Sequence, residues 1–385
     1  MQKWEQIQGV YLHTPFCLQK CLYCDFASYA GFTESEMAAY TDVVCHTITA
    51  AVPTLPVADK ATIYFGGGTP SLLPAPLLAQ LVAALQKQGY WRAPTEATIE
   101  VNPGTADLAK LRFFRQLGFN RISFGVQSLN DAELRAAGRI HTAREALTAI
   151  ELAEQAGFDH ISADLIYGLP GQSLATLRSS LAALTERGLQ HLSVYGLTVE
   201  ANTPLAQLLA AGKIQLPDED MQLAMYELVQ EYLQQRGLQR YEISNYAVPG
   251  QESQHNLVYW HYLPYAAFGS AGCSFDGKRR LTATTDVRAY IAGVNSGAAA
   301  SAVVEELERA TQLAEYLFMG LRTTAGIDLL EAKQRFDCDV MSEFGVELKK
   351  FIVKNLVNYN SEQNRLSLTE QGLRFSNQIF EIFVK

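Results

Sequence analysis

Residues 11–26 read YLHTPFCLQKCLYCDF and place Cys17, Cys21 and Cys24 in a C-x3-C-x2-C spacing. One short loop therefore supplies three thiolates. A 4Fe-4S cluster has four irons, each of which normally takes one cysteine thiolate, so three local thiolates leave one iron open to a substrate or cofactor. The other cysteines are scattered singly along the chain, at Cys45, Cys273 and Cys338. The spacing predicts a 4Fe-4S cluster held by Cys17, Cys21 and Cys24.

Other uses of three close cysteines are weaker explanations of this loop. A structural zinc site usually takes four ligands from paired motifs, and no second pair exists, although His13 could serve as a fourth ligand. Disulfide frameworks belong to small secreted domains, and the polar start of the chain does not resemble a signal peptide. Three reduced core cysteines remain an alternative, but one that is rare at this spacing.

The bulk composition limits the class of protein. The chain has 385 residues, of which 48% are hydrophobic, enough for a large core and more than one domain. No apolar run approaches the roughly 18 residues that span a bilayer. The net charge of −9 and the lack of a basic cluster argue against nucleic-acid binding. We expect a protein of the reducing cytoplasm, where an oxidisable cluster survives, with no nucleic-acid partner.

The first 200 residues alternate between short apolar runs, rich in β-branched and aromatic residues, and stretches with the period of a helix. Repeated β/α units predict a parallel sheet, and six units predict a partial (β/α)6 TIM-like barrel within an α/β fold. A doubly wound open sheet is the alternative. The predicted strands are Gly9–His13, Ala61–Phe65, Thr98–Val101, Arg121–Phe124, Ile161–Ile166 and His191–Tyr195. The predicted helices are Ser35–Ala51, Ala75–Gln88, Asp107–Gln116, Ala143–Ala156 and Leu174–Arg187.

Polar and glycine-rich residues follow the carboxyl end of each predicted strand. In β/α barrels these ends build the active site, so the pattern predicts one common mouth around the cysteine loop. The first predicted strand leads into the cysteine loop. The segments at the ends of the second to sixth strands are Gly66–Pro70, Glu100–Gly104, Ser123–Gln127, Tyr167–Gly171 with Asp164 before it, and Tyr195–Thr198.

Three regions are expected along the chain: a cluster-bearing barrel core at 1–200, a barrel extension at 201–304, and a small winged-helix-like domain at 305–385. Within the extension, Pro217–Arg236 has the pattern of an amphipathic helix with Asp218 as its N-cap, and Ala266–Gly297 is rich in small and loop-forming residues. The last region combines helical segments with a strand that forms a hairpin.

The cysteine motif and its flanks resemble the signature of the radical S-adenosylmethionine (SAM) enzymes. More narrowly, they resemble the branch that contains oxygen-independent coproporphyrinogen III oxidase and its heme-chaperone relatives, and the likeness spans about residues 9–380. It implies that SAM chelates the open iron and that reduction cleaves SAM to a radical. It also implies that Tyr23 packs against the adenine.

Further cofactor-binding residues follow from the same resemblance. The Gly66–Pro70 segment could let a backbone approach a ligand closely, or could be only a tight turn. Glu100 could bind a ribose or be a solvated surface group, and Arg139 could pair with a carboxylate of SAM or with Asp131. Whether one or two SAM molecules bind stays open. The residues that match SAM-binding positions are Tyr11, Tyr23, Gly67, Gly68, Thr69, Glu100, Gln127, Arg139, Asp164 and Thr198.

The segment His255-Asn-Leu-Val-Tyr-Trp260 suggests a second cofactor. A histidine among aromatic residues could ligate heme iron, although such a residue is more often a hydrogen-bonded structural one. The H-N-x-x-Y-W pattern resembles the heme-binding motif of the chaperones in this family. Cys273, in a glycine-rich loop that departs from the family pattern, is a candidate for heme contact or a free buried cysteine.

Two features favour a heme chaperone over the oxidase. The oxidase has a further cysteine where this chain has Phe26, and an extension before its motif where this chain has ten residues. A chaperone would pass heme to acceptor apoproteins, which could include membrane-associated ones, and could act as a homodimer. The alternatives are radical decarboxylation of coproporphyrinogen III propionates and an unrelated radical reaction.

Overall fold

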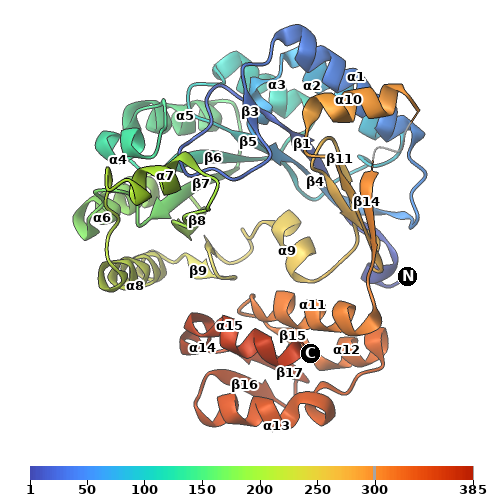
Figure 1. Ribbon diagram of the computed structural model, residues 1–385, viewed down its shortest axis with the longest axis vertical. Helices are drawn as coiled ribbons and strands as arrows, with labels where there is room; N and C mark the ends of the chain where they lie inside the picture. The colour runs from blue at the N-terminus through green and yellow to red at the C-terminus, as the bar shows by residue number, and fades with distance from the viewer. Residues whose placement is uncertain (298–300, 385) are drawn as a thin grey trace.

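The barrel core consists of six parallel strands joined in chain order (Figure 1). The computed structural model describes residues 1–297 and 301–384. Neighbouring strands pair in parallel register from Gly9 opposite Thr62 to Asp164 opposite Ser193, which confirms the predicted (β/α)6 arrangement. The strands are β1 (Ile7–Thr14), β4 (Val57–Gly67), β5 (Ala97–Val101), β6 (Arg121–Gln127), β7 (His160–Tyr167) and β8 (His191–Gly196).

The helices that connect these strands lie along the convex side of the sheet (Figure 1). Local side-chain caps set where three of them begin: Thr33, Thr142 and Ser173 each accept a hydrogen bond from the third helical residue, whose side chain returns the bond. All five predicted helices are present within one or two residues, and short α4 was not predicted. They are α1 (Glu34–Ala50), α2 (Ala75–Lys87), α3 (Leu108–Leu117), α4 (Asp131–Ala136), α5 (Ala143–Gln155) and α6 (Leu174–Thr185).

Side chains alternate along each barrel strand between an apolar outer face and a polar inner face. Residues such as Ile63, Ile99 and Ile122 are fully buried on the outer face, in the apolar core that the helices share. Successive side chains of a strand point to opposite faces, so the residues between them face the barrel interior. TIM-barrel interiors are normally packed with branched apolar residues, so this polar interior indicates a chamber rather than a core. The inner residues are Tyr64, Thr98, Glu100, Arg121, Ser123, Ser162, Asp164, His191 and Ser193.

Further strands extend the sheet at both ends to twelve strands, in the order β14-β13-β12-β11-β1-β4-β5-β6-β7-β8-β10-β9. The region 266–297, expected to be rich in loops, contains short strands of a meander beside β1 and a helix. Its strands are only three to five residues long, so pairing with neighbours rather than local pattern defines them. The added strands are β9 (Gln239–Arg240), β10 (Asn245–Ala247), β11 (Tyr265–Phe268), β12 (Cys273–Phe275), β13 (Arg279–Ala283) and β14 (Ser301–Glu306).

Four more helices belong to this extension or pack beside it. The predicted amphipathic helix is α8 (Glu219–Gln235), and Asp218 caps it as expected by accepting a 2.8 Å hydrogen bond from the amide of Met221. The others are α7 (Pro204–Ala210), α9 (Gln254–Trp260) and α10 (Val287–Asn295). Short elements complete the region: β2 (Phe16–Cys17), β3 (Tyr29–Ala30), and the 3-10 turns η1 (Lys3–Glu5) and η2 (Pro70–Leu72).

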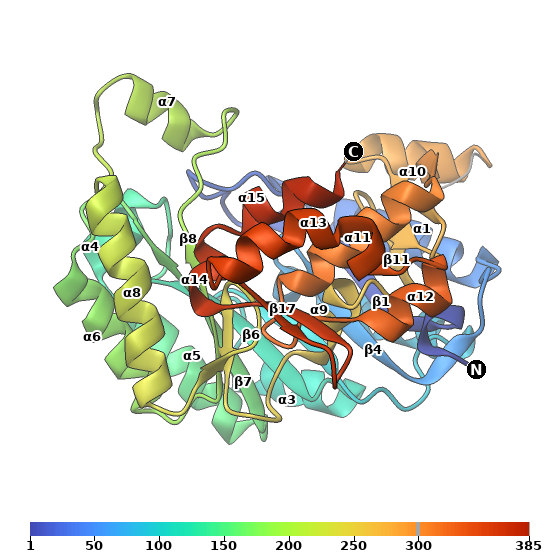
Figure 2. The same cartoon turned by 90° about the horizontal axis from the view of Figure 1, so that it is seen from below.

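The C-terminal region packs helices around a three-stranded sheet of order β15-β17-β16, on the side of the barrel seen in Figure 2. It has an apolar core of its own, which includes the fully buried Leu317, Leu348 and Leu366. The predicted helical, winged-helix-like region is thus present. Its elements are α11 (Arg309–Leu321), β15 (Ile327–Asp328), α12 (Leu329–Phe336), α13 (Val340–Val353), β16 (Val357–Asn360), β17 (Arg365–Leu368), α14 (Glu370–Arg374), α15 (Ser376–Phe380) and η3 (Glu381–Phe383). Among the described residues, no helix has the length and apolar character needed to cross a membrane.

Candidate functional site

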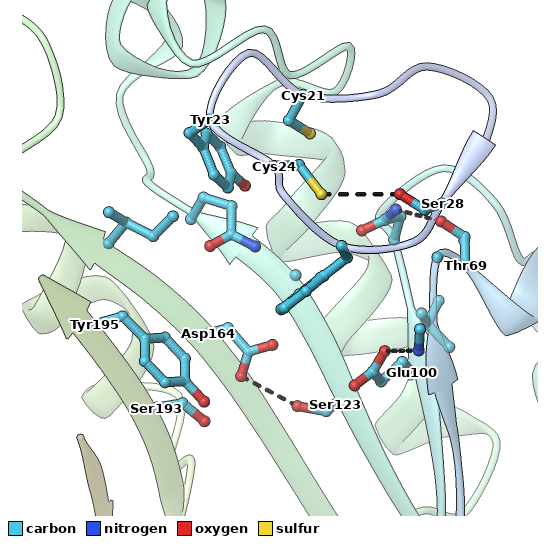
Figure 3. Close-up of a pocket in the computed structure, with 18 of the residues that line it drawn as sticks. Cys21, Tyr23, Cys24, Ser28, Thr69, Glu100, Ser123, Asp164, Ser193 and Tyr195 are labelled. Atoms are coloured by element: carbon cyan, nitrogen blue, oxygen red, sulfur yellow. Dashed lines mark hydrogen bonds between the residues drawn. The ribbon is translucent and has the colours of Figure 1, made fainter. Parts of the chain in front are cut away.

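A cavity of about 520 Å³ runs through the barrel interior from the cysteine loop to α9. Figure 3 shows Cys21, Tyr23 and Cys24 above it and the strand residues Glu100 and Asp164 along its wall. Except for Tyr11, His255 and the heme-contact candidate Cys273, every site residue predicted from the sequence lines this cavity. The lining members are Cys17, Cys21, Tyr23, Cys24, Gly67, Gly68, Thr69, Glu100, Gln127, Arg139, Asp164 and Thr198.

The three cysteines of the loop are free thiols, and each sulfur lies near a hydrogen-bonding group. Arg139 donates to the Cys21 sulfur at 3.3 Å and Thr69 to the Cys17 sulfur at 3.7 Å, while the Ser28 hydroxyl lies 3.8 Å from the Cys24 sulfur. Such donors favour sulfurs that carry negative charge, as metal-bound thiolates do. The loop thus presents three sulfurs to one cavity, each near a hydrogen-bonding group, while burial raises the pKa of the Cys17 thiol.

The described part of the chain bears on two of the alternatives for this loop, a disulfide framework and a zinc site, whereas free thiols are also what three reduced core cysteines would show. The cysteines there form no disulfide. No three His, Cys, Asp or Glu side chains within residues 1–297 and 301–384 converge as ligands of a single metal ion. His13, the proposed fourth zinc ligand, lies within hydrogen-bond distance of the Tyr11 hydroxyl (3.1 Å) and of the Ala27 carbonyl (2.9 Å) through its two ring nitrogens.

The Gly66-Gly-Gly68 segment ends β4 where three other groups approach its backbone closely. A Cβ atom on Gly66 would lie 2.8 Å from the Tyr64 ring, and one on Gly68 would lie 2.7 Å from the Phe16 carbonyl. Gly67 has a φ of +111°, and a Cβ there would lie 2.5 Å from the His13 ring. Side chains at these positions would meet neighbouring protein groups, so packing alone requires glycine here, and Gly67 and Gly68 line the cavity.

Glu100 and Asp164 place two half-buried carboxyl groups on the wall. Tyr64 donates a hydrogen bond of 2.7 Å to Glu100, and the Gly67 amide donates one of 3.2 Å to the other oxygen. Burial raises the pKa of Glu100 to about 7 and that of Asp164 to about 6. Ser123 donates to Asp164 at 3.3 Å. Glu100 is thus not a solvated surface group, and both carboxyls are held where a ligand can meet them.

The raised pKa of Glu100 predicts how stability depends on pH. Between its ordinary pKa of 4.5 and about 7 the folded state holds a proton that the unfolded state has released. The free energy of unfolding therefore falls as the pH rises through this window. Glutamine cannot lose a proton, so Glu100→Gln removes this pH dependence. We expect the change in the free energy of unfolding that Glu100→Gln causes in the cluster-free protein to be more favourable at pH 8 than at pH 5, by on the order of 2 kcal/mol. Urea unfolding at both pH values measures this difference.

Glu154→Gln, at an exposed position of α5, is the control for that measurement, and we expect the same small effect at both pH values. A Glu100→Gln effect that is also equal at pH 5 and pH 8 would contradict the raised pKa.

Arg139 joins the cysteine loop to two strand ends. Besides Cys21 it donates to the Asn102 side chain at 2.7 Å and to the Gly125 carbonyl at 2.6 Å. Asp131 instead accepts a hydrogen bond from the amide of Ala143. The alternative of an exposed pair between Arg139 and Asp131 is therefore wrong, and the guanidinium belongs to the cavity wall.

His255 lies outside the cavity wall, in the packed interior of the fold. Its side chain is 1% exposed. One ring nitrogen lies 2.8 Å from the Thr62 hydroxyl and the other 2.9 Å from the Tyr259 hydroxyl, and burial lowers its pKa to about 3. In this conformation the ring is neutral and both nitrogens are engaged, as the structural alternative describes. Tyr11 does not line the cavity either, and its hydroxyl lies 3.1 Å from a ring nitrogen of His13.

Helix α9, which carries His255, is fastened to the barrel by Glu96. This buried carboxylate accepts hydrogen bonds from the amides of Gln254 and His255, both at 2.9 Å, and from the Ser253 hydroxyl at 3.2 Å. Arg121 lies 3.7 Å from the same carboxylate. Glu96 thus satisfies amides at the start of α9 that have no partner within the helix.

The cavity also has a polar lower wall that the sequence motifs did not predict, which includes Arg121, Ser162, His191 and Asn256. A signal was present in the alternation of strand residues, as in Arg-Ile-Ser-Phe at 121–124 and His-Leu-Ser-Val at 191–194. Polar residues at every second position of a buried strand indicate a hydrated or ligand-binding face.

Comparison with known proteins places this geometry in a family. Residues 11–184 match the Radical SAM superfamily, and residues 307–375 match the HemN C-terminal domain. A protein named Heme chaperone HemW from Bacillus subtilis is 33% identical over 380 residues, which cover 98% of this chain and 99% of the relative. The chain belongs to the HemW family. A Heme chaperone HemW from Lactococcus lactis is 32% identical over 377 residues, covering 98% of this chain and 97% of the relative.

The HemW family shares its fold with a solved radical SAM enzyme. Coproporphyrinogen III oxidase (HemN) from Escherichia coli matches with a TM-score of 0.84 and 22% identity, over 98% of this chain and 90% of that one. This likeness confirms the radical SAM fold. Membership of the superfamily implies a 4Fe-4S cluster and SAM. The free thiols of the cysteine loop and the crowded glycine segment beside them fit such ligands.

Proposed function

We propose that this protein is a cytoplasmic heme carrier that also binds a SAM-chelated 4Fe-4S cluster and transfers heme to acceptor apoproteins. The observation that carries the proposal is one polar cavity with the cysteine loop at one end and the helix of the His255 motif at the other. The nearly full-length likeness to proteins named heme chaperones supports the heme part.

In this proposal Cys17, Cys21 and Cys24 hold three irons of the cluster, and the cavity wall holds SAM. When bound, the two cofactors supply one-electron reductive chemistry. The chain's own residues bind and orient: Arg139 presents a positive charge, and Glu100 presents a carboxyl group beside the amide of Gly67. Tyr23 belongs to the same wall.

Heme would bind at α9, with His255 as the iron ligand. Its neutral ring has the protonation state that metal ligation requires, but a ring nitrogen must first leave Thr62 or Tyr259. At the other end of α9 the Arg322 guanidinium lies over the Trp260 ring, 4.8 Å from its centroid, while the Trp260 ring nitrogen and the Arg322 Nε are buried without hydrogen-bond partners within the described structure. Unpartnered buried donors cost stability.

A heme titration followed by absorbance tests this proposal on the anaerobic, reconstituted protein. We expect saturable one-to-one binding by the wild type and a loss of at least tenfold in affinity for His255→Ala. Tyr259→Phe removes a hydroxyl that occupies one ring nitrogen, so we expect heme affinity to rise by roughly fivefold, the value of one hydrogen bond of about 1 kcal/mol. His46→Ala, at an exposed position of α1, is the control and is expected to bind as the wild type does.

Binding that is indifferent to His255 would contradict the proposed ligand, and absence of specific binding would contradict the carrier. A porphyrin product formed from coproporphyrinogen III under anaerobic reduction would favour the oxidase instead. Sedimentation analysis and co-pelleting with membranes test the remaining parts of the proposal, namely a homodimer and membrane-associated acceptors.

A further inference from the structure

Stacked rings connect the buried histidine of α9 to the cavity. The His255 ring stacks on Tyr64 with centroids 5.0 Å apart and planes at 24°. Tyr64 also stacks on Tyr11, with centroids 6.2 Å apart and planes at 24°. The three residues come from α9, β4 and β1, so the stack joins elements that are far apart in the sequence.

From Tyr64, a short hydrogen-bonded route leads to the ligand side of the wall. Its hydroxyl donates to one oxygen of Glu100 at 2.7 Å, and the other oxygen accepts from the amide of Gly67 at 3.2 Å. Glu100 is thus fixed at both oxygens, once by a side chain that stacks on His255 and once by the glycine segment.

From Tyr11, a second route leads to the cysteine loop. The Tyr11 hydroxyl lies 3.1 Å from one nitrogen of His13, and the other nitrogen lies 2.9 Å from the carbonyl of Ala27, three residues after Cys24. The His13 ring sits directly against Gly67, where an added Cβ would lie 2.5 Å away. Both routes therefore meet at the glycine segment.

The His255 ring has little room to shift while it stays in place. A Cβ on Gly9 would lie 3.2 Å from the ring, and Thr62 and Tyr259 hold its two nitrogens. Because well-packed groups have few intermediate positions, exposing a ring nitrogen to a large planar ligand requires the ring to leave Tyr64. Tyr64 would then lose the contact that fixes one face of its ring.

We propose that His255 is a positioning residue for the ligand cavity, acting through Tyr64 on Glu100, and that heme ligation by His255 therefore opposes SAM binding. The second part rests on the proposed function; the first does not. A ligand bound against Glu100 stabilises the conformation in which the His255 ring stacks on Tyr64. Heme stabilises the conformation in which the His255 ring has left Tyr64. By linkage, each then lowers the affinity for the other by the same factor.

Equilibrium dialysis of labelled SAM against the heme-free, cluster-reconstituted protein tests the positioning role. We expect His255→Ala and Tyr64→Phe to weaken SAM binding by about tenfold and about fivefold, as loss of one or two buried interactions implies. His255→Phe keeps an aromatic ring against Tyr64 but has no nitrogen for iron. It is expected to bind SAM within about twofold of the wild type and to lose heme ligation.

A second measurement needs neither cofactor. Hydrogen exchange of the Gly67 amide in the cluster-free protein reports directly on the bond to Glu100. We expect faster exchange in His255→Ala and Tyr64→Phe and wild-type exchange in His46→Ala, while the amides of α3 stay unchanged in all three variants. General loosening of the fold would instead speed exchange at both places.

The outcomes separate the two proposals. Unchanged SAM affinity and unchanged Gly67 exchange in both His255→Ala and Tyr64→Phe would overturn the positioning role, whether or not heme binds. Failure of every protein to bind heme, with SAM affinity still lowered in His255→Ala, would overturn the heme carrier and leave the positioning role intact. If heme binds the wild type without changing its SAM affinity, the antagonism is wrong.

Discussion

Cys24→Ala is expected to abolish iron–sulfur loading. A cluster held by three thiolates loses a third of its protein ligands, and alanine offers no donor in their place. The Cys24 sulfur faces the cavity, and the loop shows no spare cysteine beside it that could replace it. After anaerobic reconstitution we expect iron and sulfide contents close to background, against about four of each per wild-type chain.

Cys45→Ala is the matched control for that loss. Cys45 lies on α1, outside the cavity, and its replacement also removes one thiol from the chain. We expect its iron and sulfide contents to equal those of the wild type. A brown Cys24→Ala protein with full iron content would show that the cysteine loop is not the cluster site.

Gly67→Ala is expected to have the second largest effect, on stability and on ligand binding together. A φ of +111° is strained for any residue with a Cβ, at roughly 1–2 kcal/mol, and the new Cβ would also meet the His13 ring at 2.5 Å. Overpacking of this kind adds roughly 1–3 kcal/mol. His13 has little freedom to recede because both of its nitrogens are engaged. We expect the free energy of unfolding to fall by about 2–5 kcal/mol.

The same change is expected to weaken SAM binding by more than tenfold. Relief of the clash has to move the end of β4, and with it the amide that holds Glu100. Gly104→Ala is the control, since Gly104 has a φ of +83° but no atom within 4 Å of an added Cβ. Gly104→Ala therefore has the strain of a positive φ but no clash between the added Cβ and a neighbouring group. Equal losses in the two variants would show that the close approach of His13 to Gly67 contributes nothing.

The barrel could be predicted from the sequence because its signals are local. Each strand is a short run rich in β-branched or aromatic residues, and the caps at Thr33, Thr142 and Ser173 come directly before the helices they begin. Parallel strands place their carboxyl ends at one edge, so topology alone gathers the cysteine loop, Gly67, Glu100 and Asp164. The resemblance then supplied cofactor roles, which geometry by itself leaves unassigned.

The extension of the sheet could not be predicted in the same way. Strands β11 and β12, of four and three residues, are too short for periodicity to distinguish them from loops, and β11 pairs with the edge that β1 offers. The same holds for α9, whose position depends on Glu96, about 160 residues earlier in the chain.

The sequence by itself determined the cysteine loop, the six β/α units and the single mouth they share, because spacing and periodicity act over a few residues. Only the tertiary structure determined that the barrel interior is hollow and that Arg139 belongs to the cavity. It also determined that His255 is buried against Tyr64 rather than open to a ligand. These properties depend on which side chains meet across strands and helices, and no local pattern in the chain encodes such contacts.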